Sequence, residues 1–213
     1  MSNTATQHFS PLMSDSAPAT PDLSSDDAVD VALMMRAKVG DQAAFQQLVE
    51  RHQNVVIGTV AKMLGNASDA QDIAQQVFIR LWKSAPRYKR KAKFTTFLFT
   101  IMRNLVFNES RRRSRHKTHS LEEREAESFN QLAENEDKNP DAETLQKELQ
   151  SAVDKAINSL PEKQRMAVIL RRYENMPYEQ IAEILEVSVS AVKSQLFRAR
   201  TDLREHLKPY LEE

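Results

Sequence analysis

The stretch PYEQIAEILEVSVSAVKSQLFRAR, residues 177–200, decides the fold class of this chain. Apolar residues recur at helical spacing on both sides of a short turn at Glu186 and Val187. The small side chain of Ala182 lets two helices cross closely, and Ser188 is a good N-cap for the second one. The stretch therefore predicts a helix-turn-helix. Because Glu186 stands where a turn glycine is common, a positive φ there would add modest backbone strain.

The second helix of this motif is expected to present a polar and basic face. Short side chains at its start suit base edges, Lys and Arg neutralise phosphates, and Gln195 can pair with an adenine edge. An ordinary helical hairpin with a solvated basic face is the alternative, but the turn length, the small residue and the basic helix together favour DNA binding. The candidate residues are Ser188, Ser190, Ala191, Lys193, Ser194, Gln195, Phe197, Arg198 and Arg200.

Composition supports an all-helical chain. Only 3 of the 213 residues are Gly and 8 are Pro, which leaves little turn chemistry for sheets. There is no Cys, as is compatible with a reducing cytosol. No apolar run approaches the roughly 18 residues that a membrane span needs, and the first residues do not resemble a signal peptide. We therefore expect a cytoplasmic protein without membrane insertion.

Charge is segregated along the chain although the formal net charge is zero. The stretch before residue 31 has about five acids, no Lys or Arg, and many Ser, Thr, Ala and Pro, which is typical of disorder. Residues 80–117 carry about thirteen Lys or Arg against one acid, Glu109, and so require an anionic partner. Residues 121–149 reverse the sign, with about ten acids against about three bases, as in a mobile linker.

Helical periodicity and capping residues predict two small helical domains joined by an acidic flexible linker. The boundaries are 1–27 for a disordered tail, 28–114 for the first domain, 115–140 for the linker and 141–213 for the helix-turn-helix domain. The helices expected in the first domain are 31–39, one from Asp41 to Gly65, one from a Ser68–Gln71 capping box to Trp82, and one capped by Thr95 or Thr96. Those expected in the second are 141–160, one opened by Pro161, one opened by Pro177 and one capped by Ser188.

Cations and aromatic rings are mixed between Arg87 and Arg113. Single-stranded DNA favours this combination, because charge follows the backbone while rings stack on bases. Tyr88 and Phe94 are candidates for stacking or for the core, whereas Phe97 lies on the inward stripe. The candidate phosphate contacts are Lys89, Arg90, Lys91, Lys93, Arg111, Arg112 and Arg113.

Four strings of sequence together resemble the extracytoplasmic-function (ECF) sigma factors of bacterial RNA polymerase, in the order found in that family. They are DAQDIAQQVFIRLW (69–82), KFTTFLFTIMRNLVFNESRRR (93–113), INSLPEKQRMAVILRRYENMPYEQIAEIL (157–185) and VSVSAVKSQLFRARTDLRE (187–205). The resemblance implies that the first domain reads and opens the minus-ten promoter element. It also implies that the second domain reads the minus-thirty-five element, and that core RNA polymerase holds both on promoter DNA.

The resemblance also implies site residues. Arg103, Asn104 and Asn108 would approach the minus-ten bases, with a solvated helix face as the alternative for either Asn. The helix 68–82 would dock on the polymerase, with packing alone as its alternative, and family members usually carry an acid where this chain has Gln76. The candidate polymerase contacts are Asp72, Gln75, Gln76, Phe78 and Ile79, while Ile73, Val77 and Leu81 are expected in the core. The acidic linker would pass through the polymerase cleft or act only as a tether.

No pattern for catalysis, a metal or another cofactor is present, so we expect no enzyme activity. The five His are scattered, and the three Gly cannot form a phosphate-binding loop. Without such a loop the chain cannot use a nucleotide to open promoter DNA, so opening of the strands must be driven by binding. Two other functions compete with that of a sigma factor. The main alternative is an autonomous dimeric regulator that binds an operator, and the second is a helical RNA-binding or scaffold protein. The sequence leaves open whether an anti-sigma protein also binds the chain.

Overall fold

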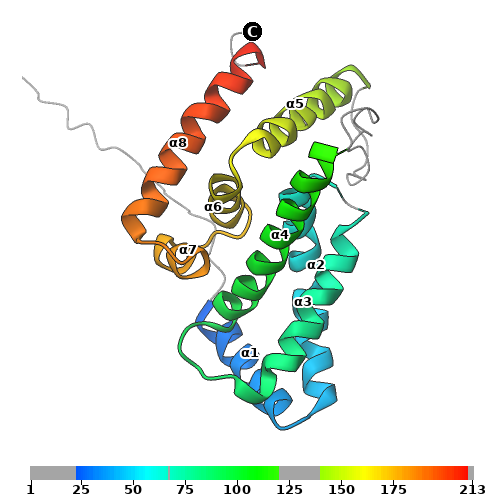
Figure 1. The fold of residues 1–213 in the computed structure, drawn as a ribbon, viewed down its shortest axis with the longest axis vertical. Helices are drawn as coiled ribbons and strands as arrows, with labels where there is room; N and C mark the ends of the chain where they lie inside the picture. The colour runs from blue at the N-terminus through cyan, green and yellow to red at the C-terminus, as the bar shows by residue number, and fades with distance from the viewer. Residues whose placement is uncertain (1–22, 67, 120–139, 211–213) are drawn as a thin grey trace, which may run out of the picture.

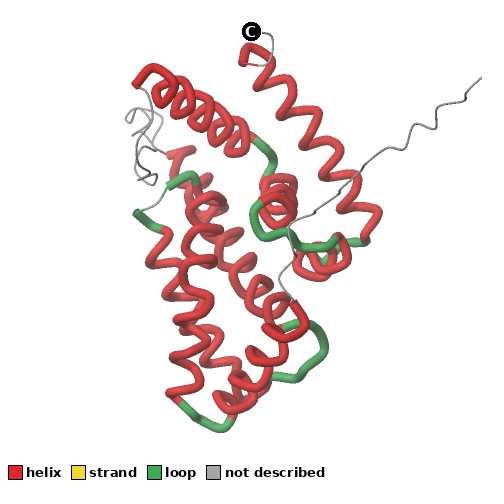
Figure 2. Tube along the Cα trace, turned by 180° about the vertical axis from the view of Figure 1, so that it is seen from behind, coloured by secondary structure: helices red, strands yellow, loops and turns green. Residues whose placement is uncertain are grey.

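The chain is all-helical in a computed structural model that describes residues 23–66, 68–119 and 140–210 (Figure 1). This confirms the expected fold class, and there is no strand in those ranges (Figure 2). The helices are α1 (Leu23–Lys38), α2 (Gln42–Leu64), α3 (Ala70–Ser84), α4 (Phe94–His119), α5 (Pro140–Ser159), α6 (Glu162–Arg172), α7 (Tyr178–Leu185) and α8 (Val189–Leu207). Single turns of 3-10 helix follow α3, at Ala85–Arg87, and α8, at Lys208–Tyr210.

Helices α1 to α4 form one group, called here the N-terminal bundle. Helix α2 begins as predicted at Asp41, whose side chain accepts a hydrogen bond from the Ala44 N–H at 3.0 Å. It ends at Gly65, whose φ of 65° lets its N–H reach the carbonyl of Ala61. The expected core residues Ile73, Val77 and Leu81 are buried between α3 and its neighbours, with the helices α2 and α4 on either side.

The start of three helices differs from the prediction. Helix α1 begins at Leu23, so residues 23–27, which we had placed in the disordered tail, are helical. No capping box forms at α3, because Ser68 bonds to Asn66 and the helix begins after Asp69. Helix α4 begins at Phe94, and neither of the expected caps, Thr95 and Thr96, precedes it.

Helices α5 to α8 form the second group, called here the C-terminal bundle. Pro161 and Pro177 each stand immediately before a helix, where the absence of an N–H has no cost. Helix α6 packs against α7 and α8, with Met166, Ile169 and Leu170 fully buried between them. This packing fixes the angle between the two helices of the helix-turn-helix.

The two bundles touch each other. Figure 1 shows α7 beside the lower half of α4, and α2 also contacts α5 and α6. The buried apolar residues of both bundles belong to one continuous core. The predicted linker, 115–140, overlaps the last turn of α4 and the first residue of α5, and its residues 120–139 lie outside the described part. The boundaries of the two domains therefore stay a prediction.

A buried carboxylate fixes α1 on α2. Asp30 is 2% exposed and accepts hydrogen bonds from Arg51 Nε at 2.7 Å and His52 Nε2 at 2.8 Å. Burial alone would raise the pKa of Asp30, but the bonds from His52 and Arg51 lower it below its usual value. Asp30 therefore contributes stability above its usual pKa of 3.8, and this contribution is lost as the pH falls through the lowered value.

Replacing Asp30 with Ala should lower the free energy of unfolding by about 2 kcal/mol, because His52 and Arg51 lose a buried charged acceptor. Urea unfolding followed by circular dichroism measures this. Asp26→Ala is the matched control: Asp26 bonds to the same Arg51 at 3.1 Å but is exposed, so less than about 0.5 kcal/mol is expected. Equal losses for the two variants would contradict the role given to Asp30.

Candidate nucleic-acid interface

The turn between α7 and α8 holds its shape through backbone bonds. Glu186 adopts a left-handed conformation, with a φ of 55°, and Val187 N–H donates to the carbonyl of Ala182 at 3.0 Å. The side chain of Ser188 accepts from the Ala191 N–H at 3.2 Å, which confirms it as the N-cap of α8. The turn thus requires a positive φ at Glu186, where a residue other than Gly is strained.

The packing of α7 and α8 leaves one side of α8 uncovered. Ala182 is buried at the crossing, and Val192 and Ala199 are fully buried on the inner side of α8. Because an α-helix has 3.6 residues per turn, the residues half a turn away point outward. The expected DNA-binding residues that are exposed are Ser188, Ser190, Lys193, Ser194, Phe197, Arg198 and Arg200. We call the last six of these the recognition face.

Two predicted residues of α8 lie at the edge of the recognition face. Ala191 and Gln195 are half-buried. The Oε1 atom of Gln195 is enclosed and has no hydrogen-bond partner in the described structure, so this amide is less available to an adenine than expected. Phe197, in contrast, is 69% exposed, which is unusual for a large apolar side chain. The recognition face therefore offers cations, hydroxyls and one aromatic ring.

Helix α4 presents a second polar face. Asn104 and Asn108 are exposed and lie one helical turn apart, as predicted. Arg103 is buried instead, with a side chain that is 7% exposed, and its Nη2 contacts Glu186 Oε1 of the turn at 2.7 Å. This pair lowers the pKa of Glu186 below its usual value, through the hydrogen bond and the charge of Arg103. The helix-turn-helix thus covers Arg103, which is not available to DNA in this arrangement.

The basic run at the end of α4 is partly neutralised within the chain. Arg112 and Arg113 both contact Glu109, at 2.8 and 2.9 Å, and Arg113 also contacts Asp69. The hydrogen bond from Arg112, aided by Arg113, lowers the pKa of Glu109 to about 2. Arg111 and Arg112 are exposed. The cluster therefore carries less free positive charge than the sequence suggests.

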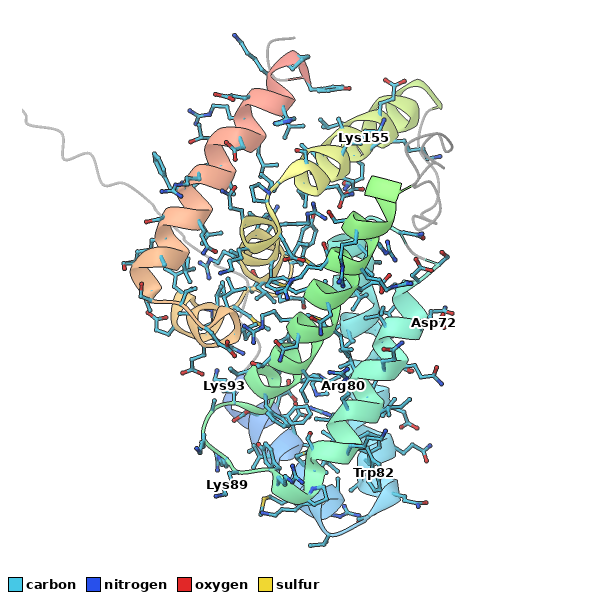
Figure 3. All side chains as sticks on the ribbon, viewed as in Figure 1. Asp72, Arg80, Trp82, Lys89, Lys93 and Lys155 are labelled. Carbon is cyan, nitrogen blue, oxygen red and sulfur yellow. The ribbon has the colours of Figure 1, made fainter. Side chains whose placement is uncertain are left out.

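The loop before α4, residues 88–93, is called here the cationic loop. It is exposed in its middle and bounded by buried residues at both ends. Lys89, Arg90, Lys91 and Lys93 are exposed, and Figure 3 shows Lys89 and Lys93 on the side of the molecule opposite Asp72. Tyr88 is 3% exposed and Phe94 is fully buried, so neither ring can stack on a base in this conformation. Tyr88 packs on the half-buried Phe97, with ring centroids 5.3 Å apart. The two rings that were candidates for stacking are thus core residues.

The outer face of α3 carries an apolar groove of about 340 Å³. Asp72, Gln75, Gln76 and Ile79 are exposed as expected, and Ile79 is 45% exposed. Phe78 is mostly buried and lines the groove. Figure 3 labels Asp72 and Trp82 at opposite ends of α3. The groove is lined by Gln42, Phe45, Gln75, Phe78, Ile79 and Trp82.

Sequence reasoning missed the part of the groove that comes from α2 and from the end of α3. The spacing of Phe45 and Trp82 fits the apolar stripes of their helices, but their rings meet at the surface, with centroids 4.9 Å apart. Phe45 follows the N-cap of α2 by four residues and Trp82 lies in the last turn of α3. Large rings at helix ends, where a bundle offers less cover, are the signal that could have identified them.

Several polar contacts join the bundles alongside the apolar core that they share. Besides Arg103 and Glu186, Gln180 Nε2 donates to Thr95 Oγ1 at 2.9 Å, and Arg165 Nη1 donates to the carbonyl of Met63 at 2.8 Å. Thr59 Oγ1 donates to Glu174 Oε1 at 2.9 Å. Burial raises the pKa of Glu174, against the lowering effect of that bond. Separating the bundles therefore has to break these part-buried polar contacts and expose part of the shared apolar core.

Two families of domains match the chain. "Sigma-70 region 2" matches residues 48–116, and "Sigma-70, region 4" matches residues 150–203. The first match covers the part of the groove that α3 provides, the cationic loop and most of α4. The second covers α6, α7 and the whole recognition face.

Full-length relatives match as well. The RNA polymerase sigma-H factor of Pseudomonas aeruginosa is 32% identical over 186 residues, which is 86% of this chain and 96% of that protein. The ECF RNA polymerase sigma-E factor of Escherichia coli is 33% identical over 191 residues, 88% of this chain and 98% of that protein.

Two solved structures share the fold. CnrH, in complex with the cytosolic domain of CnrY, superposes with a TM-score of 0.62 at 24% identity, over 85% of this chain and 98% of CnrH. The sigma factor RpoE, in complex with the anti-sigma factor NepR from Bartonella quintana, superposes with a TM-score of 0.63 at 24% identity. That match covers 77% of this chain and 96% of RpoE.

Replacing Glu186 with Gln should increase the population in which the bundles are apart about fivefold, because Arg103 loses its charged acceptor. The chain contains no Cys, so the pair Lys83→Cys and Arg204→Cys can be labelled alone and followed by single-molecule energy transfer. Glu183→Gln makes the same change of charge at an exposed position of α7 and should leave the distribution unchanged. An unchanged distribution with Glu186→Gln would show that the pair does not hold the bundles together.

Proposed function

This chain belongs to the sigma-70 family as an ECF sigma factor of RNA polymerase, and on this premise we propose how its two bundles divide promoter recognition in transcription initiation. The recognition face of α8 reads the minus-thirty-five element as duplex. The cationic loop and the outer face of α4 bind the minus-ten element as it melts. The groove on α3 docks on core polymerase. The chain contributes binding and no chemistry of its own.

The exposure of the recognition face carries this proposal. A helix fits the major groove of B-DNA, and the short side chains of Ser190 and Ser194 allow it to approach base edges closely. Phe197 can make apolar contact with a thymine methyl group. Lys193, Arg198 and Arg200 flank these residues and can neutralise phosphates on both sides of the groove.

Opening of the minus-ten element has to be driven by binding energy. Unstacking costs a few kcal/mol per base step, which captured bases and backbone contacts must offset. Asn104 and Asn108 can hydrogen-bond to base edges, and the exposed cations of the loop can follow the displaced backbone. Because Tyr88 and Phe94 are buried, these polar groups are the ones available for base contacts while the loop keeps this conformation.

Binding at both elements requires the bundles to separate. Arg103 reaches DNA only after Glu186 releases it. A partner that has a higher affinity for the separated form shifts the population toward it. We propose that core polymerase is this partner and that it holds the two bundles at the spacing of the promoter elements. The acidic segment between them then serves as a tether.

Two further assignments follow from the family. CnrH is described in complex with the cytosolic domain of CnrY, and RpoE in complex with the anti-sigma factor NepR. We propose that this chain too is held by an anti-sigma protein. Because polymerase acts in the cytoplasm, we also place this chain there. No helix in the described ranges is long and apolar enough to cross a membrane.

Placing a charge in the α3 groove should weaken binding to core polymerase. Ile79→Asp is expected to lower the affinity at least about tenfold, because an unpaired carboxylate would be buried at the contact. Competition for core polymerase against a labelled sigma factor measures this. Val39→Asp changes another exposed aliphatic residue, outside the groove, and should have no effect. An equal loss for both variants would argue against the groove as the docking site.

Run-off transcription with purified core polymerase on genomic promoters tests the proposed function as a whole. Lys193→Ala combined with Arg198→Ala should reduce initiation about tenfold on promoters with a minus-thirty-five element. It should also lower the salt dependence of binding by about one unit of slope per cation removed. Asn104→Ala should slow opening while leaving closed-complex binding intact. Lys155→Ala combined with Lys163→Ala, which removes two exposed cations elsewhere in the C-terminal bundle, is the control.

The rival functions make different predictions for the same experiment. An autonomous regulator would bind duplex tightly without polymerase. A helical RNA-binding or scaffold protein would be insensitive to the recognition-face variant. The absence of polymerase-dependent initiation by the wild-type chain would remove the proposed function.

A further inference from the structure

The cationic loop, residues 88–93, is held at both ends by the same helix. At the start of the loop, Lys38 Nζ donates a hydrogen bond to the carbonyl of Tyr88 at 3.0 Å. At its end, the N–H of Phe94 donates to Asp27 Oδ1 at 2.8 Å. Both Lys38 and Asp27 belong to α1, where they are separated by eleven residues, about 16 Å along the helix axis. We call these two residues the loop anchors.

The anchors satisfy groups that the loop itself leaves without partners. The Phe94 N–H is one of the first N–H groups of α4, which have no acceptor within their own helix. A carboxylate at this position both accepts the bond and interacts favourably with the positive end of the helix dipole. The Tyr88 carbonyl lies beside a buried ring and receives the ammonium of Lys38. Both bonds are partly buried, which makes their loss more costly than at the surface.

Helix α1 is itself rigidly placed. The buried Asp30, three residues after Asp27, binds Arg51 and His52 of α2. The ring of His52 packs on Phe94, with centroids 5.2 Å apart, directly behind the end of the loop. Helix α1 also packs against the 3-10 turn at Ala85–Arg87 and against α4. The loop anchors are therefore fixed relative to both elements that the loop connects.

We infer that α1 sets the shape of the cationic loop, and that Asp27 and Lys38 are positioning residues for recognition of the minus-ten element. This inference rests on the proposed function, in which the loop contacts the melted strand. The anchors touch no DNA. They hold Tyr88 and Phe94 inward, so that the exposed cations between them keep one arrangement from which bases can be distinguished. A loop with a free end would still attract phosphates but would discriminate bases less well.

The test uses the full-length chain bound to core polymerase. Promoter opening is measured on a cognate promoter and on promoters with single-base changes in the minus-ten element. Asp27→Ala and Lys38→Met should each reduce the ratio of opening rates, cognate to changed, about fivefold, the factor expected for one such hydrogen bond. Dependence on the minus-thirty-five element and the affinity for core polymerase should stay as in the wild type.

Matched variants separate positioning from loss of folding. Asp26→Ala removes the neighbouring carboxylate, which bonds only to the exposed side of Arg51 among the described contacts, and should leave the ratio unchanged. Asp27→Asn and Lys38→Arg keep an acceptor and a donor at the anchors and should restore most of the ratio. A ratio unchanged by Asp27→Ala and Lys38→Met, or lowered equally by Asp26→Ala, would overturn the inference.

A further variant distinguishes this inference from the function on which it rests. Lys89→Ala combined with Arg90→Ala removes loop cations that touch neither anchor in the described structure. If this variant slows opening while Asp27→Ala does not change the ratio, the loop binds DNA and the inference alone is wrong. If it has no effect on opening, the role of the loop in the proposed function and the inference are both wrong.

Discussion

The contact between α4 and α7 is the constraint on which the exposed surfaces of the molecule depend. At its centre Arg103, almost fully buried, pairs with a carboxylate on the turn of the helix-turn-helix. The pair covers the inner side of α4 and leaves Asn104 and Asn108 outside. It also orients the C-terminal bundle so that the recognition face of α8 points away from the N-terminal bundle. The surface that we propose reads duplex is thus exposed, while part of the surface proposed for melted DNA is covered.

Helix caps and helix ends could be predicted from the sequence, because they depend on contacts between residues that are close in the chain. Asp41 and Ser188 cap their helices, and Gly65 ends one, because each needs only backbone groups within four residues. The recognition face follows from helical period and from the small residue at the crossing. The family resemblance was carried by the same local patterns.

Most of the misses at the candidate sites share a cause, since each depends on a partner distant in the chain. Tyr88 and Phe94 are buried because α1 closes over both ends of their loop, and the first turn of α1 has the composition of a disordered tail. Arg103 finds its acceptor 83 residues away. Helical spacing is compatible with Phe45 and Trp82 on apolar stripes, but it cannot show that neighbouring helices leave the end of each stripe uncovered.

The pair of Arg103 with Glu186 has a consequence for the energetics of promoter capture. In the free chain, separating the bundles breaks the ion pair and leaves Arg103 without its carboxylate partner, which is unfavourable. Beside DNA, the same guanidinium could exchange the Glu186 carboxylate for a backbone phosphate. The free-energy cost of breaking the ion pair would then be largely offset. Glu186 is already exposed in the pair, with 69% of its side chain accessible, so it stays solvated after separation. Nucleic acid would thus act as a substitute ligand for the arginine, and the separated form would be more favourable where DNA is present.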